Sequence, residues 1–199
     1  MNSFIIKNKR FVGPAILVVA ALLVYYYLAI YNSYHFVEIY ASYKSYQSVN
    51  EMYNDADLVV LAKPAKNFID RDHHSNYYNL SKTAIGGFYT NTEINIEKIL
   101  KDPSEVPKTL TIIEPVTLIQ GLNGKTELSY ENYKPMKKNS PYVIFMRKNT
   151  FGNYSVINMQ NGKFNMDKTD PGDDQTGNKQ SDDQKLSWKN EIKNKFGIK

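Results

Sequence analysis

The residue types best suited to chemistry gather in one short stretch, which reads Asp70-Arg71-Asp72-His73-His74. Carboxylate oxygens and imidazole nitrogens bind divalent metals, and a bound metal can activate a water molecule for hydrolysis. Adjacent histidines lack the separated spacing of a helical zinc site, however, and no Cys is present to complete a ligand set. We therefore expect an ordinary polar loop, with metal-assisted hydrolysis by Asp70, Asp72, His73 and His74 as the alternative.

A second acidic group lies near the carboxyl end of the chain, and its spacing invites comparison with a calcium loop. An EF-hand loop places oxygen ligands at alternate positions and ends on a Glu. Here Thr169 and Pro171 occupy two of those positions, and no Glu closes the loop. The pattern therefore disfavours calcium binding by the four carboxylates of this group, which are Asp167, Asp170, Asp173 and Asp174.

Glu114 is a different kind of candidate, because it lies in phase with apolar neighbours on a predicted strand. A carboxylate buried in this way would have a raised pKa, and such residues often mark functional clefts. The alternative is that the strand slips in register at Pro115, which would turn the Glu114 side chain outward.

Familiar catalytic motifs are missing from the sequence. Apart from the adjacent pair, the chain has one further histidine, His35, and it contains no Gly-x-Ser-x-Gly elbow, phosphate loop or paired-histidine helix. We therefore expect no cofactor, and we favour a binding or interaction module over an enzyme.

An uncharged, apolar stretch covers residues 11–31 and determines where these candidates lie. As a helix rising about 1.5 Å per residue it would be roughly 30 Å long, which matches the hydrocarbon core of a bilayer. Three basic residues precede the stretch, and no Lys or Arg follows it until Lys44. This asymmetry predicts residues 1–10 in the cytoplasm and the chain after residue 31 outside the cell membrane.

A cleaved signal peptide is the alternative for the same stretch. Its apolar region is usually shorter, about 7 to 15 residues, and ends at a small-x-small cleavage site. Bulky tyrosines stand here instead, at positions 25, 26, 27 and 31. The pattern favours an uncleaved transmembrane anchor.

The rest of the chain divides into a connector, a β domain and a tail. Residues 32–47 are rich in Tyr and Ser, and we expect a solvated linker or a short continuation of the helix. Ser48 and Glu51 fit a capping box, which predicts a short helix over 49–54. The β domain covers residues 48–166.

Strands are predicted wherever apolar residues alternate or run continuously within this domain. The polar segment 65–87 is expected to be a long loop. Residues 98–100 break an alternating pattern, which predicts a bulge or a bend. The predicted strands are 57–63, 88–98, 109–120, 126–130, 142–146, 154–159 and 163–166.

The tail, residues 167–199, begins with a run too polar to bury a core, so we expect disorder there. A possible amphipathic helix follows over 184–196, with Trp188, Ile192 and Phe196 on one face. That face could contact a partner or the membrane, pack on the domain, or belong to a frayed end.

These elements predict a mainly β fold, an OB-like antiparallel barrel behind one transmembrane helix and a short helix, with a sandwich as the alternative. Residues 54–63, 92–101 and 135–146 resemble a group of bacterial membrane-anchored proteins of unknown function. The same layout is similar, more distantly, to netrin-like domains such as the tissue inhibitors of metalloproteinases, which implies an OB-fold barrel. Those inhibitors act through an amino-terminal Cys held by disulfides, and this chain has no Cys. The resemblance therefore implies the fold, and an envelope protease inhibitor or sensor follows by analogy alone.

Charge and topology set the expected partners. The formal net charge of +5 is modest, and a domain outside the cell would not meet nucleic acid. We expect the bilayer to be a partner through residues 11–31. Another envelope protein, or an anionic wall polymer at Lys134, Lys137 and Lys138, is the other expected partner.

Overall fold

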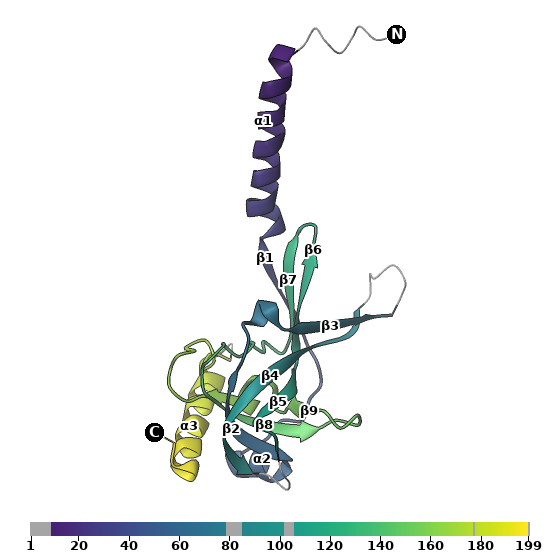
Figure 1. Ribbon diagram of the computed structural model, residues 1–199. Helices are drawn as coiled ribbons and strands as arrows, with labels where there is room; N and C mark the ends of the chain where they lie inside the picture. The colour runs from purple at the N-terminus through teal and green to yellow at the C-terminus, as the bar shows by residue number, and fades with distance from the viewer. Residues whose placement is uncertain (1–8, 79–84, 102–105, 177, 199) are drawn as a thin grey trace.

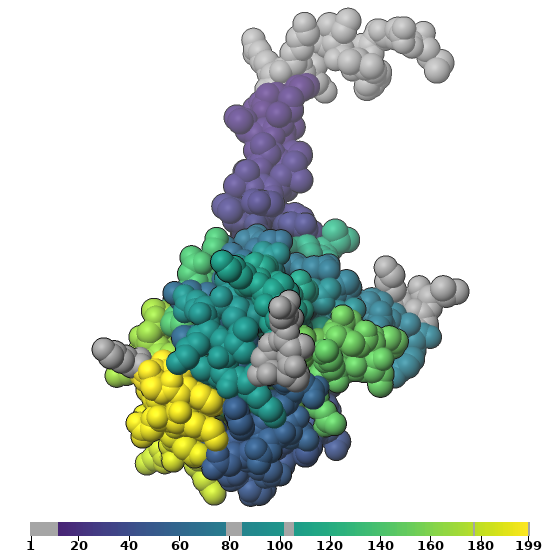
Figure 2. All heavy atoms as spheres, turned by 60° about the horizontal axis from the view of Figure 1, so that its bottom comes forward, coloured from purple at the N-terminus to yellow at the C-terminus, as the bar shows by residue number. Residues whose placement is uncertain are grey.

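The computed structural model describes residues 9–78, 85–101, 106–176 and 178–198 (Figure 1). An apolar helix projects from a rounded β domain, as Figure 2 also shows. Helix α1 (Lys9–Tyr25) continues as a π-helical turn, η1 (Tyr26–Tyr31). Within them, Val12–Tyr31 is long and apolar enough for a membrane anchor or a signal sequence, and none of it is buried in the domain.

The domain is built on a closed barrel of five strands, which confirms the predicted mainly β fold. Neighbouring strands are antiparallel except at one place, where Ile113 of β5 pairs in parallel with Ser155 of β9. Closure leaves no long unpaired edge between these strands. Around the barrel the strands are β2 (Leu58–Pro64), β4 (Ile85–Lys101), β5 (Thr109–Glu114), β9 (Tyr154–Val156) and β8 (Tyr142–Lys148), and β8 pairs again with β2.

Strand β4 bends around the barrel where its alternation breaks. Its pairing with β2 shifts in register between Val59 and Val60, so that Lys101 and Ile99 face consecutive residues. The extra residue, Leu100, forms the bulge that the sequence predicted in this segment. A second shift follows between Leu61 and Ala62.

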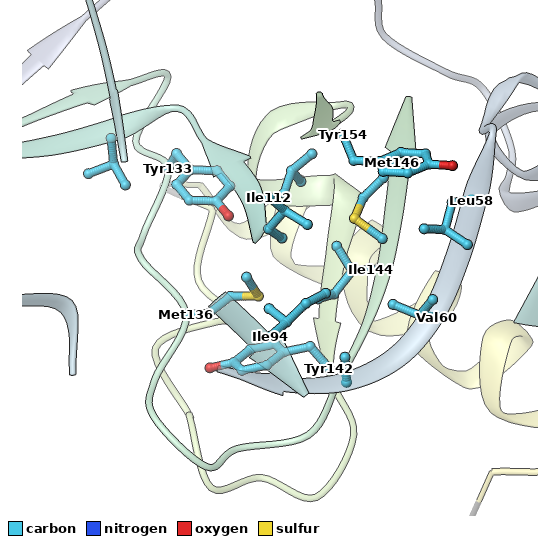
Figure 3. Close-up of a cluster of buried hydrophobic side chains, with 13 residues drawn as sticks. Leu58, Val60, Ile94, Ile112, Tyr133, Met136, Tyr142, Ile144, Met146 and Tyr154 are labelled. Atoms are coloured by element: carbon cyan, nitrogen blue, oxygen red, sulfur yellow. The ribbon is translucent and has the colours of Figure 1, made fainter. Parts of the chain in front are cut away.

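Strands β2 and β8 are buried on both faces, as their continuous apolar runs predict. Inside the barrel, side chains from β2, β4, β5 and β8 meet, as Figure 3 shows for Val60, Ile94, Ile112 and Ile144. Outside it, a second cluster joins the other faces of β2 and β8 to two helices. These helices are α2 (Val49–Asp55) and α3 (Lys179–Phe196).

Helix α2 begins after Ser48, as the capping box predicts, although the return bond to Glu51 comes from Gln47 rather than from Ser48. The Ser48 hydroxyl accepts a hydrogen bond from the Glu51 N–H at 3.1 Å, and the Glu51 carboxylate accepts one from the Gln47 N–H at 2.8 Å. Two backbone donors at the helix start are thereby satisfied.

A second, three-stranded sheet lies between the barrel and the apolar helix (Figure 1). Its order is β1 (Tyr34–Ile39), β7 (Gly124–Tyr130) and β6 (Val116–Gly121). Part of the expected connector is therefore a strand, because β1 pairs in parallel with β7 about ninety residues away. The predicted strand 109–120 is divided at Pro115, which has no N–H to continue a ladder.

The expected loop 65–87 also contains regular structure. A 3₁₀ turn, η2 (Phe68–Asp70), leads into β3 (Asp72–Tyr77), which pairs with the start of β4. The sequence of β3 is too polar to show a strand pattern. Its extended conformation depends on pairing with β4. Residues 79–84 of the expected loop lie outside the described residues.

The tail is ordered where disorder was expected. Strand β10 (Lys163–Asn165) pairs with β8, and the segment after it folds back so that Asp173 is fully buried. Helix α3 begins earlier than predicted, because Asn178 caps it by accepting from the Ser181 N–H at 2.9 Å. Figure 2 shows α3 (yellow) beside the blue atoms of the α2 region.

Candidate functional site

The candidate site is a cleft of about 280 Å³ between the end of β1, the turn after β7, the 3₁₀ turn η3 (Met159–Gly162) and the start of α3. Four segments that are distant in sequence converge there. The residues that define its chemistry are Glu38, Tyr40, Tyr43, Glu131, Asn158 and Asn161.

Strained backbone surrounds this cleft. Glu131 and Asn132 have φ values of 49° and 55°, and Asn158 and Met159 have values of 58° and 48°. These are four of the six non-glycine residues with positive φ in the described chain, and all four line the cleft. The left-handed conformation costs a residue such as Glu or Met about 1–2 kcal/mol, and such strain is often found at functional sites.

Hydrogen bonds fix the acidic wall of the cleft. The Glu131 carboxylate accepts from the Ala41 N–H at 2.8 Å, and the Glu131 N–H donates to the Ile39 carbonyl at 3.2 Å. Burial, and then the nearby Glu131 charge, raise the pKa of the Tyr43 hydroxyl above its usual value. Tyr43 therefore stays protonated and can donate a hydrogen bond into the cleft.

Asn161, which lines the cleft, has an unused acceptor. The Oδ1 atom of Asn161 is buried and has no hydrogen-bond partner among the described residues. The amide of its neighbour Asn158 donates elsewhere, to the Asn161 carbonyl at 3.5 Å and to the Met52 sulfur at 3.7 Å. A buried acceptor without a partner costs about 1–3 kcal/mol, which a ligand donor at this place would recover.

The charge of the lining defines the ligand chemistry. Glu38 and Glu131 carry negative charge, the Asn and Gln side chains offer amides, and the described lining residues include no Lys or Arg. Tyr40 is 79% exposed and offers a ring face. The cleft therefore suits a small ligand that carries hydrogen-bond donors rather than an anion.

The predicted metal residues do not converge. Asp72 and His74 lie on one face of β3, where the His74 Nε2 atom is 2.8 Å from the Asp72 carboxylate, and His73 points to the opposite face, as strand alternation requires. His73 contacts the Thr90 hydroxyl at 2.9 Å, and burial lowers its pKa. Asp70 is in η2. Within the described chain, no three His, Cys, Asp or Glu side chains are grouped to hold a metal.

Glu114 is buried, and its partner is Arg71, whose Nη1 atom lies 2.6 Å from the carboxylate. The Tyr133 hydroxyl donates to the same carboxylate at 2.8 Å, and the Met136 N–H donates to it at 3.0 Å. The Thr92 hydroxyl donates to it as well. Burial raises the pKa of the Tyr133 hydroxyl well above its usual value. Every oxygen of Glu114 is engaged, so this cluster stabilises the barrel end and leaves no free group for chemistry.

The acidic residues of the tail make separate ion pairs and hydrogen bonds. Asp173 contacts Lys163 and also Lys185, whose Nζ atom is 3.4 Å from the carboxylate. Asp174 pairs with Lys189 at 2.9 Å, and Asp170 accepts from the Tyr142 hydroxyl at 2.5 Å. Asp167 accepts from the Thr169 N–H at 3.0 Å. These carboxylates therefore stabilise the packing of the tail on the domain.

The apolar face of α3 packs on the barrel. Trp188 is 7% exposed and Ile192 is fully buried, both in the outer cluster with β2 and β8. Phe196 lies against Tyr53, with ring centroids 5.7 Å apart. Of the alternatives for this face, the structure shows packing on the domain, so it is not an open surface for a partner.

Comparison with known proteins identifies no relative of this chain. No protein-family model matches the chain, and no curated protein matches it significantly.

Sequence reasoning missed the residues of the cleft. Glu38 lay in the expected connector, and Glu131 and Asn161 lay in expected turns, so none of them stood on an element that the patterns predicted. The asparagines gave a faint signal, because Asn adopts the left-handed conformation more readily than most residues.

Proposed function

We propose that the protein is a single-pass membrane protein that displays a binding module outside the cell, and that its ligand enters the cleft beside β1. The observation that carries the proposal is the cleft itself, where strained backbone holds two carboxylates, two tyrosines and an unused buried acceptor around one space. Strain and an unsatisfied acceptor are both costs to the free protein, and a bound ligand would offset the second.

Contacts at the end of the apolar helix support an anchor over a cleaved leader. The Tyr26 hydroxyl donates to the Leu122 carbonyl at 2.6 Å, and the Lys125 N–H donates to the Ser33 carbonyl at 2.8 Å. A leader that is removed has no need of bonds to the mature domain. The basic residues Lys7, Lys9 and Arg10 favour a cytoplasmic amino terminus.

The ligand that fits best is small and rich in hydrogen-bond donors. Carboxylates and amide oxygens accept from such donors, and the exposed ring of Tyr40 offers an apolar face beside them. The module would thus bind its ligand while the helix keeps it at the membrane surface.

Site-directed photocrosslinking in intact cells tests both parts of this proposal. The chain has no Cys, so Ser181→Cys places a single thiol in the cleft for a membrane-impermeant, photoreactive reagent. We expect a reproducible adduct that Glu131→Gln weakens, because this change removes a charge and keeps the side-chain shape. Phe151→Cys, 87% exposed and outside the cleft, is the matched control.

The outcomes separate the two parts. Labelling at both positions with an adduct only in the cleft supports the proposal. Labelling at both positions with the same adducts, or none, overturns the ligand site. If both positions are labelled in opened cells but neither is labelled in intact cells, the domain is not outside the cell, and the proposed orientation is wrong.

A further inference from the structure

We infer that the tip of the β6–β7 hairpin is a lipid-binding element that enters the outer leaflet beside the helix; this rests on the proposed function, in which Val12–Tyr31 spans the bilayer. The tip is the two-residue turn Leu122–Asn123 between Gly121 and Gly124. Figure 1 shows β6 and β7 reaching from the domain toward the helix, with their turn beside the helix end.

The depth of the tip follows from its contacts with the helix end. The Tyr26 hydroxyl donates to the Leu122 carbonyl, and the Asn123 carbonyl lies 3.1 Å from the Ser33 hydroxyl, so the tip lies between the level of the Tyr26 side chain and the first residues after the span. Tyr26 lies five residues before Tyr31, the end of the apolar span, which is about 7 Å along a helix. With the span fully in the bilayer, the tip is therefore at the depth of the headgroups and outer acyl chains.

The chemistry of the tip suits that depth. Leu122 is 80% exposed and apolar, and nothing in the domain covers it. Lipid cannot bond to backbone carbonyls, so a segment that enters it must satisfy them internally. The Leu122 carbonyl accepts from Tyr26, the Asn123 carbonyl from the Ser33 hydroxyl at 3.1 Å, and the Gly121 carbonyl from the Gln120 side chain at 2.9 Å.

A glycine allows the hairpin to lie close against the segment that follows the helix. Gly124 has φ +117°, and a Cβ there would lie 2.2 Å from the Ser33 hydroxyl oxygen and 2.8 Å from the Ser33 carbonyl oxygen. Two more contacts join the parts, from the Gln120 amide to the Tyr31 carbonyl at 3.1 Å and from the Lys125 ammonium to Asn32 at 3.0 Å. The helix and hairpin thus meet the bilayer as one unit, which fixes the orientation of the barrel above it.

Depth-dependent quenching tests the inference on the full chain in phosphatidylcholine–phosphatidylglycerol vesicles. Single cysteines at Leu122, Leu22 and Phe151 carry a small fluorophore, and the lipids carry bromine at defined acyl positions. All three side chains are exposed, at 80%, 61% and 87%. We expect the Leu122→Cys label to lose fluorescence most with bromine near the headgroup, the Leu22→Cys label with bromine deep in the bilayer, and the Phe151→Cys label not at all.

Gly124→Ala supplies the second variant. It should abolish the quenching at position 122 and leave that at position 22, because it separates the hairpin from the helix end. Gly152→Ala is its matched control, since Gly152 also has positive φ, at +82°, but has open space around its Cβ position. It should leave the quenching at position 122 unchanged.

Each failure has its own meaning. A label at position 122 that is quenched no more than the one at 151, while the label at 22 is quenched, overturns the hairpin inference and leaves the anchor intact. A label at position 22 that escapes quenching overturns the anchor, and the hairpin inference with it.

Discussion

Glu114 and Asp173 are both fully buried carboxylates, but they lie in different parts of the molecule and have different partners. Glu114 ends strand β5 and is neutralised by one cation, Arg71, with neutral donors on its remaining lone pairs. Asp173 lies in the tail and contacts two cations, Lys163 and Lys185. One cluster is balanced in charge, and the other has an excess of positive charge.

That difference appears in the protonation of the tail cluster. Burial opposes the charge of Asp173, but Lys163 and Lys185 outweigh it and hold the Asp173 pKa below its usual value. Burial lowers the pKa of the Lys185 ammonium to about 7, although Asp173 acts in the opposite direction. The cluster in the tail should therefore change its protonation near neutral pH, through Lys185.

The largest effect is expected from removing the cation of the balanced cluster. Arg71→Met leaves Glu114 buried without a counter-charge, which should lower the free energy of unfolding by about 3–5 kcal/mol. Urea unfolding of the full chain in detergent, followed by far-UV circular dichroism, measures this. The double variant Arg71→Met/Glu114→Gln should recover part of the loss, because no lone charge remains. A single variant as stable as the native chain would show that the pair contributes nothing.

A smaller and more local effect is expected in the tail. Asp173→Asn leaves two buried ammonium groups, but Lys185 can release its proton, so we expect a loss of about 2–3 kcal/mol. Trp188, the sole Trp of the chain, reports on α3. Its fluorescence should therefore change at lower urea than the far-UV signal of the barrel. Asp174→Asn, which alters a more exposed pair, is the control, and coincident transitions in Asp173→Asn would mean that tail and barrel unfold together.

The barrel could be predicted from sequence because its signals are local. Continuous apolar runs identify β2 and β8, and the break at residues 98–100 gives the bulge in β4. Strands β1 and β3 were missed because each is ordered by a partner, β7 or β4, rather than by its own pattern. Tertiary contacts of this kind override local propensity.

The candidate site was less predictable than the fold. Glu114 stood out because a carboxylate in phase with apolar residues is unusual, but its partner Arg71 lay unnoticed within the proposed metal stretch. The order of the tail depends on Asp173, whose two lysine partners are ten and twelve residues away on opposite sides. The cleft combines four separate segments, and the positive φ of Glu131 has no signal in the sequence.

The smallest effect concerns the pH dependence of the tail cluster. In the unfolded chain Lys185 keeps its proton up to its usual pKa of 10.5, whereas the folded protein releases it near pH 7. The unfolded state therefore binds more protons between these values, so stability rises with pH in this window, by up to about 1.4 kcal/mol per pH unit. We expect a gain of about 2 kcal/mol between pH 7 and pH 9, measured by urea unfolding with Trp188 fluorescence. Lys185→Met should remove this gain while Lys189→Met, on the same helix, retains it, and an equal gain in all three proteins would assign the pH dependence to another group.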